Sequence, residues 1–153
     1  MAGNSRLATA IHVAGMLSFV DNVPMTSENI ARSVNTNAVV IRRIIGLLTK
    51  AEIVKVKMGV GGGACLAKQP ESINLAEIYL ALDENSVFDV PQLEDSHQCV
   101  LGKIVRPVLS EVLIEVENSL LESLRKITLA DVIGRVQERM LKLGVCDENI
   151  QNG

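Results

Sequence analysis

An alternating segment and the glycines that follow it limit the fold of this chain more than any other feature. Residues 53–58 (Ile-Val-Lys-Val-Lys-Met) alternate apolar and cationic side chains, which is typical of a half-exposed strand. Four of residues 59–63 are glycine, and the mainly apolar residues 64–67 follow them. Strand, glycine turn and strand predict a hairpin. Because the hairpin comes directly after a helical pattern, its position is typical of a wing.

The residues before the hairpin contain three apolar patterns at helical spacing. The first pattern predicts a helix at about 5–19, and the second predicts a short helix after a cap at Thr26 or Ser27. The third predicts a helix at about 38–51. We expect the buried stripe of the third helix to consist of Val40, Ile41, Ile44, Leu47 and Leu48. Its other side carries cations, and a tight polar turn at 35–37 separates it from the second helix. These features predict a helix-turn-helix.

The residues after the hairpin are also mainly helical. We predict a short helix that ends near Asp83 and a long helix beyond residue 100. A final helix is expected from a cap at Thr128 to about Lys142. Pro107 must sit in the first turn of the long helix or kink it. The expected fold is therefore mostly α with a small β-hairpin. We divide it into a winged helix-turn-helix domain (1–83), a linker (84–98), a helical dimerisation region (99–145) and a tail (146–153).

The long helix has an apolar face with two interpretations. It can pack on the first domain as a core element, or it can pair with the same helix of a second copy. We favour the second, because the face is too wide to be covered by one short neighbouring helix. The expected dimer interface consists of Val105, Leu109, Val112, Val116 and Leu120. A two-fold dimer would match a palindromic DNA site.

Charge is distributed unevenly along the chain. Residues 1–70 hold eight basic and three acidic side chains, whereas residues 71–153 hold seven basic and fifteen acidic ones. A basic first half on an acidic second half favours contact with a polyanion through the first half. Uneven decoration of the surface is the alternative.

The third helix and the hairpin supply the candidate DNA contacts. The start of a helix in the major groove approaches base edges, cations suit phosphates or guanine, and exposed amides at a helix start can hold phosphate. Glycines at the hairpin tip allow close approach to the sugar–phosphate backbone. The expected DNA-binding residues are Arg6, Thr26, Ser27, Asn35, Thr36, Asn37, Val40, Arg42, Arg43, Lys50, Lys55, Lys57, Gly61 and Gly62. Alternatively, the cations form only the solvated face of a core helix.

Other classes of function are disfavoured by the sequence. Gly63 leads into an expected strand, whereas a phosphate-binding loop needs Gly-Lys-Ser/Thr at the start of a helix. Three aromatic residues are too few for a base-stacking platform, and no motif pairs a nucleophile with a base. Three widely spaced cysteines predict no metal, cofactor or disulfide framework. They fit a reducing compartment, and no run can span a bilayer, so we expect a cytoplasmic protein without a membrane partner.

Cys99 is a candidate sensor thiol. It lies near the expected start of the long helix, where a thiol can have a lowered pKa and react with oxidants or electrophiles. A cysteine in this position is more often simply a small, semi-buried apolar residue. The effector, whether a small molecule or a redox signal, is not indicated by the sequence.

Four segments together resemble the Rrf2 family of bacterial regulators over about residues 4–142. They are Leu47–Val54, Gly59–Ala67, Ser72–Ile78 and Ile127–Val132, which match the end of the recognition helix, the glycine-rich wing, the next helix and the final helix. The resemblance implies a homodimeric winged-helix transcription factor, usually a repressor. Family members sense iron–sulfur clusters, nitric oxide or cysteine-metabolism signals.

The resemblance also identifies differences from the family pattern. Cluster-binding members carry three closely spaced cysteines before the long helix, whereas this chain has only Cys99 there, so a cluster is not expected. An arginine commonly precedes the wing glycine, and this chain has Met58. Residues matching the base-reading turn are Asn35, Asn37 and Val40, with Arg42 and Arg43 in the exposed continuation. A winged-helix module that binds protein instead of DNA, and a thiol switch at Cys99, stay open as alternatives.

Overall fold

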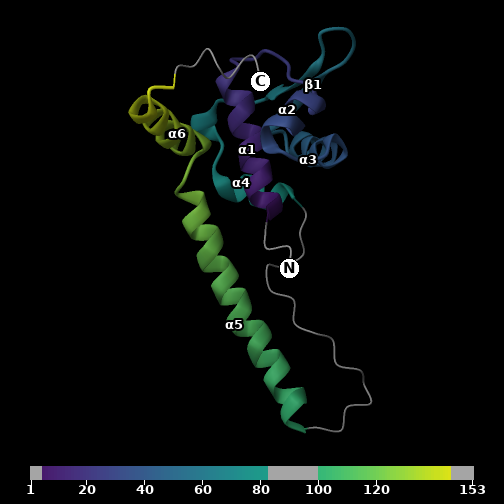
Figure 1. The fold of residues 1–153 in the computed structure, drawn as a ribbon. Coiled ribbons are helices and arrows are strands. Elements are labelled where there is room, and N and C mark those ends of the chain that lie inside the picture. The colour runs from purple at the N-terminus through teal and green to yellow at the C-terminus, as the bar shows by residue number, and fades with distance from the viewer. Residues whose placement is uncertain (1–4, 83–99, 146–153) are drawn as a thin grey trace.

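Six α-helices, one 3₁₀ turn and one two-stranded antiparallel sheet make up residues 5–82 and 100–145, which a computed structural model describes (Figure 1). The predicted fold class is confirmed. The elements are α1 Ser5–Phe19, α2 Ser27–Val34, α3 Ala38–Lys50, β1 Val54–Lys57, β2 Gly63–Leu66, η1 Pro70–Ser72, α4 Leu75–Ala81, α5 Val100–Arg125 and α6 Leu129–Leu143. The predicted linker (84–98), Cys99 and the predicted tail (146–153) lie outside the described residues.

α1 forms the centre of the N-terminal core. Ala10, Val13, Ala14 and Leu17 are almost completely buried, at the i, i+3, i+4, i+7 spacing of one helix face. α2, α3, α4, α6 and β2 all contact α1 (Figure 1). The core is aliphatic, and its largest fully buried side chains include Leu17, Ile30, Ile41, Ile44, Leu48, Ile53 and Ile78.

Side-chain caps fix the turn between α2 and α3. Thr26 caps α2 by accepting a hydrogen bond from the Asn29 N–H at 3.3 Å. Asn35 ends α2 in the left-handed conformation (φ 56°), which asparagine adopts more readily than most residues. Asn37 caps α3, its Oδ1 accepting from the Val39 N–H at 2.8 Å. The two helices of the helix-turn-helix therefore have defined ends and a short, ordered connection.

The buried stripe of α3 differs from the predicted one. Val40 was expected inside but is 42% exposed, and Leu47 is only partly buried. Ile45, which was not expected in the stripe, is buried instead. The observed stripe is Ile41, Ile44, Ile45 and Leu48, which is one continuous helical face. The prediction for Val40 was wrong because Val39, Val40 and Ile41 are consecutive apolar residues, and spacing alone does not decide which of them faces the core.

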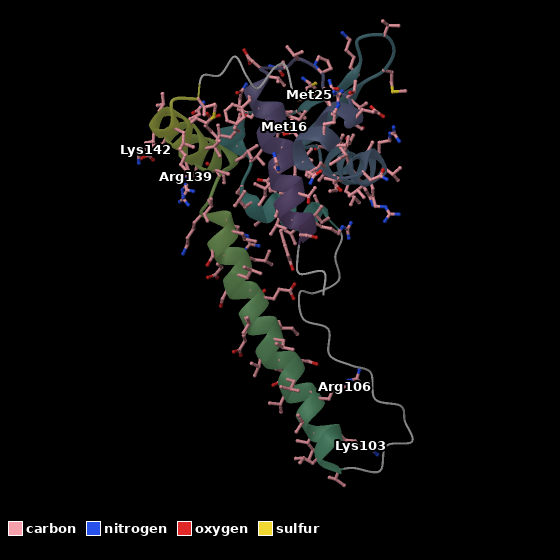
Figure 2. All side chains as sticks on the ribbon, viewed as in Figure 1. Met16, Met25, Lys103, Arg106, Arg139 and Lys142 are labelled. Carbon is pink, nitrogen blue, oxygen red and sulfur yellow. The ribbon has the colours of Figure 1, made fainter. Side chains whose placement is uncertain are left out.

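The wing hairpin is held to the domain by a backbone contact on its inner side. β1 and β2 pair antiparallel, with Val54 opposite Leu66. On the other side of β2, Met25 and Ala64 exchange two backbone hydrogen bonds of 2.9 and 2.8 Å (Figure 2 labels Met25). β2 is thus an inner strand and β1 an edge strand, so β2 is mostly buried while β1 is exposed after Val54.

Gly63 makes the contact with Met25 possible. A Cβ at Gly63 would lie 2.5 Å from the Met25 carbonyl oxygen, and its φ of +149° is rarely adopted by other residues. We therefore expect Gly63→Ala to destabilise the protein by about 1–3 kcal/mol. The melting temperature, followed by circular dichroism, should fall by roughly 3–10 °C.

Gly134→Ala is the matched control for this substitution. A Cβ at Gly134, on the exposed surface of α6, would meet open space. Alanine is the better helix former, so this variant should be more stable by about 0.5–1 kcal/mol. Equal melting temperatures for the two variants would contradict the role given to Gly63.

α5 extends away from the N-terminal core over most of its length (Figure 1). Its 26 residues correspond to about 39 Å at 1.5 Å per residue. It meets the core through its C-terminal half, where the Tyr79 hydroxyl of α4 donates a hydrogen bond to Glu117 at 2.9 Å and Leu124 packs against the core. Pro107 lies inside the helix, beyond its first turn, so its ring removes the helical bond to the Lys103 carbonyl. No helix in the described ranges is long and apolar enough to cross a membrane.

α6 returns to the N-terminal core after α5. Thr128 and Asp131 form a capping box at its start, and these hydrogen bonds to Thr128 hold the pKa of the Asp131 carboxyl below its ordinary value. The Leu129 N–H donates to the Ile73 carbonyl at 2.8 Å. Leu129 and Ile133 lie in the same buried cluster as α1. α6 belongs to the predicted dimerisation region (99–145), and in the structure it packs against the winged-helix core.

Candidate nucleic-acid interface

α3 presents one polar face to solvent on the side away from α1. Its exposed residues recur at three- and four-residue spacing, which places them along one side of the helix: Val39, Arg42, Arg43, Gly46 and Lys50. Val39, 62% exposed near the start of α3, was not among the predicted contacts. An apolar side chain at this position can contact the methyl group of thymine. The face therefore combines cations with an apolar group at the end of α3 that would enter a groove first.

The start of α3 adds polar groups beside this face. Asn35, Thr36 and Asn37 are all exposed. The Oδ1 atom of Asn37 already accepts the capping hydrogen bond from Val39, so its amide NH₂ group is the part that can still bind a partner. Asn35 uses its backbone N–H to close α2, which leaves its side chain exposed on the turn. Two asparagine side chains thus stand at the exposed start of α3.

A carboxylate that was not predicted lies on this face. Glu28, in the first turn of α2, accepts a close hydrogen bond from Arg42 Nη2 on α3. A hydrogen bond from its own backbone, and after it the Arg42 guanidinium, hold the pKa of the Glu28 carboxyl below its ordinary value. Glu28 is therefore ionised at neutral pH. The two residues are 14 apart in the sequence, so helical periodicity gives no sign of the pair.

The wing lies beside α3 and points away from the core. β1 contacts α3, and the hairpin leaves the domain on the α3 side of α1 (Figure 1). Lys55 and Lys57 on β1 are exposed, as are Met58 and Val60 toward the tip. Cations on an edge strand also prevent pairing with other strands, which is a second reason for lysine at these positions.

Close packing explains one of the two predicted glycines near the hairpin tip, and backbone conformation explains the other. A Cβ at Gly62 would lie 2.3 Å from the Lys57 carbonyl oxygen. Gly61 has a φ of +71° and nothing within 4 Å of an added Cβ, so its backbone conformation is what favours glycine. The hairpin itself therefore requires both predicted glycines.

The remaining predicted contacts lie at different distances from the α3 face. Thr26 and Ser27 stand at the start of α2, where Thr26 is occupied as a cap. Arg6 is the second residue of α1, and the start of α1 lies at the end of the domain away from the wing (Figure 1). Lys50 lies at the last residue of α3, seven residues beyond Arg43. The structure thus brings Arg42, Arg43 and the turn together, and separates Arg6 from the wing.

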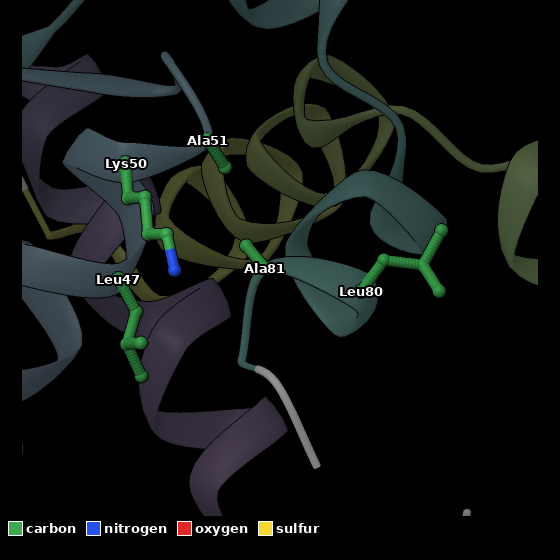
Figure 3. A pocket seen from close by; sticks show the side chains of 5 residues that line it. All are labelled: Leu47, Lys50, Ala51, Leu80 and Ala81. Carbon is green, nitrogen blue, oxygen red and sulfur yellow. The ribbon is translucent and has the colours of Figure 1, made fainter. Parts of the chain in front are cut away.

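A small hollow lies between the ends of α3 and α4. Leu47, Lys50 and Ala51 line it on one side, and Leu80 and Ala81 on the other, around a volume of about 200 Å³ (Figure 3). Figure 3 shows the Lys50 ammonium group directed between Leu47 and Ala81, while Leu80 points away. Ligand pockets are commonly about 300–1,000 Å³. The hollow is therefore small for an effector site, and it also gives Lys50 an apolar surface for its side-chain carbons.

Comparison with known proteins identifies a family. Residues 4–135 match the family described as Rrf2, iron-dependent transcriptional regulator. YwnA of Bacillus subtilis (strain 168), which is named as an HTH-type transcriptional regulator, is 38% identical over 133 residues. These residues are 87% of this chain and 98% of YwnA. The chain is thus similar to this relative over almost the whole length of that protein.

Solved structures agree with this relationship. The crystal structure of a protein described as DNA-binding has a TM-score of 0.67 at 38% identity and covers 84% of this chain and 98% of that chain. IscR of T. potens has a TM-score of 0.66 at 23% identity and covers 91% of this chain and 90% of that chain. At this lower identity, IscR bears on the fold alone.

The family description mentions iron, and an iron site needs several ligating side chains close together. Over residues 5–82 and 100–145, no three His, Cys, Asp or Glu side chains lie where they could hold a metal ion. Cys65 is a free thiol buried in β2. These residues do not fit an iron site, and no step of the DNA interaction is assigned to a metal. The match over residues 4–135, the YwnA relative and the fold show that the chain belongs to the Rrf2 family of transcriptional regulators, which are not enzymes.

Proposed function

We propose that the protein is a homodimeric repressor that binds a palindromic operator in duplex DNA. The observation that carries this proposal is the exposed α3 face beside the wing. Arg42 and Arg43 on α3 and Lys55 and Lys57 on β1 are all exposed, and β1 contacts α3. Cations grouped on a helix and on an adjacent hairpin match the major groove and the phosphates that flank it.

Base reading is assigned to the start of α3. Asn37 has amide donors left after capping, Val40 is exposed, and Arg42 projects one turn further along the helix. Asn35 and Thr36 add exposed side chains on the turn. Contacts with the DNA sugar–phosphate backbone are assigned to the wing, through Lys55, Lys57, Gly61 and Gly62. Such contacts hold the protein on the duplex without reading its sequence.

Dimerisation is assigned to α5. Within residues 100–125, which are all described, no side chain is buried. Val105, Leu109, Val112 and Val116 are each between 40% and 49% exposed and lie on one side of the helix at four-, three- and four-residue spacing. Such a continuous apolar row on a projecting helix is typical of an interface. A second copy of α5 is the occupant proposed here, because two-fold symmetry places two α3 helices on the two halves of a palindrome.

Selection of bound sequences from random duplex DNA, with the purified full-length protein, tests this proposal. We expect a palindromic motif whose half-sites have centres about one helical turn, or a multiple of it, apart. We also expect affinity that falls steeply as salt rises. A non-palindromic motif would contradict the dimer. No affinity for any duplex at low salt would contradict DNA binding and favour a winged-helix module that binds protein.

A further inference from the structure

The pairing of Glu28 with Arg42 is not explained by stability. Both side chains are more than half exposed, at 56% and 58%. Exposed ion pairs add little to folding stability, because water screens the attraction and two long side chains must be ordered. The pair also joins two helices that are already held together by the buried residues Ile30, Ala31 and Ile41. The first turn of α2 explains a carboxylate at this position, because an acid there stabilises the start of a helix. Its contact with Arg42 is the part that stability does not explain.

A carboxylate on this face opposes binding to DNA in general. Glu28 lies on the same exposed face as Arg42. The negative charge of Glu28 would repel DNA phosphates. A surface that bound DNA only through phosphates would be stronger without it. Ionisation of Glu28 persists at neutral pH, because its backbone hydrogen bond and Arg42 lower its pKa.

The contact also limits what Arg42 can do. Arginine has five N–H donors in a planar fork, and Glu28 engages one end of the fork through Nη2. Donors elsewhere on the fork stay available for a second acceptor. Guanine offers O6 and N7 side by side in the major groove, which is the acceptor pair that arginine most often reads. A guanidinium held by a neighbouring carboxylate is ordered before binding, and the carboxylate keeps it from turning to a phosphate.

We propose that Glu28 is a specificity-determining residue, which positions Arg42 to read a guanine edge and disfavours binding to phosphate alone. This inference rests on the proposed DNA-binding function and deepens it. Glu28 acts through Arg42, so it is a positioning residue. Its removal should relax the preference at one base-pair position in each half-site and leave the other positions unchanged.

The test compares the affinities of Glu28→Gln and the wild type for two duplexes at the same salt concentration. One duplex carries the motif that the wild type selects from random DNA, and the other has a random sequence. Glu28→Gln should raise affinity for the random duplex. It should lower the ratio of selected-duplex to random-duplex affinity by about 5- to 100-fold, the range for one good base contact. A repeated selection with this variant should lose the preference at one position of each half-site. Combined with Arg42→Ala, Glu28→Gln should have no further effect on the ratio.

Two further variants separate positioning from charge and from folding. Glu52→Gln removes the same charge from an exposed residue just after α3, and it should leave the ratio unchanged. Arg42→Lys keeps the cation but lacks the fork, so it should lose the guanine preference and keep affinity for random duplex. All variants should stay folded at the temperature of the binding assay. Glu28→Gln should melt slightly below the wild type, because it loses the carboxylate in the first turn of α2, whereas Arg42→Lys and Glu52→Gln should match the wild type.

The outcomes distinguish this inference from the proposed function. If the wild type selects a motif and Glu28→Gln selects the same motif with an unchanged affinity ratio, the role of Glu28 is overturned while DNA recognition stands. If Glu28→Gln and Glu52→Gln lower the ratio equally, general charge is responsible and the positioning role is again overturned. If the wild type binds no duplex, both the proposed function and the inference fail.

Discussion

Replacement of Arg42 and Arg43 together by alanine is expected to lower affinity for the selected duplex by at least about 100-fold. One guanine contact contributes about 1–3 kcal/mol, and loss of a phosphate contact weakens binding further in a salt-dependent way. Both side chains are exposed, so the fold and the dimer should be unaffected. Fluorescence anisotropy with labelled duplex gives the affinity, and light scattering gives the oligomeric state.

The matched control replaces two arginines of α6, Arg135 and Arg139, by alanine. Both are exposed, and α6 lies on the opposite side of α1 from α3 (Figures 1 and 2). This variant loses the same total charge, and it should keep its affinity within a few-fold. If both double variants bind like the wild type, α3 is not the recognition helix. If both lose affinity equally, net charge and not the α3 face determines binding.

Introduction of Glu at Leu109 and Val116 is expected to convert the proposed dimer into a monomer. Each copy would bring two charges into the apolar row, and in a two-fold interface they would face charges or apolar groups of the partner without compensation. Monomers bind half-sites independently, so affinity for the palindrome should fall by about 100-fold or more. Sedimentation equilibrium measures the dissociation of the dimer.

Asn118→Glu serves as the control for this pair of substitutions. Asn118 is exposed on α5, on the side away from the apolar row. The added charge there should leave both the dimer and the affinity unchanged. A Leu109→Glu, Val116→Glu protein that stays dimeric would show that α5 does not form the interface.

Local signals in the sequence predicted most of the elements. The caps Thr26, Asn37 and Thr128 and the glycine-rich hairpin each depend on residues within a few positions of one another. The boundaries of α1 and the start of α3 followed from apolar spacing for the same reason. The expectation for Val40 failed where three apolar residues are consecutive, because the packing of α3 on the rest of the core decides which of them is buried.

Contacts between distant segments could not be predicted from the sequence. Met25 and Ala64 pair as backbone, and neither side chain marks the contact. The pair of Glu28 and Arg42 depends on the angle between α2 and α3, which the caps and the core set together. Leu129 packs in the same buried cluster as α1, although more than a hundred residues separate the two in the sequence. Proximity along the chain associates α6 with α5 and gives no sign of this contact.

For the candidate site, the sequence predicted the exposed cations and the turn but not their neighbours. Arg42, Arg43 and Lys55 are exposed where periodicity placed them. Val39 and Glu28 were missed, because one looked like a core residue and the other like an ordinary first-turn acid of a helix. Their positions on the exposed face follow only from the structure, in which α2 and α3 together form that face.

A crystal structure of the protein on its selected duplex tests the central claim most directly. We predict two protomers per duplex, each with the start of α3 in a major groove and the β1 lysines beside flanking phosphates, and with the α5 rows packed against each other. A complex in which α3 faces away from the DNA, or in which the α5 row is exposed to solvent, would contradict the account.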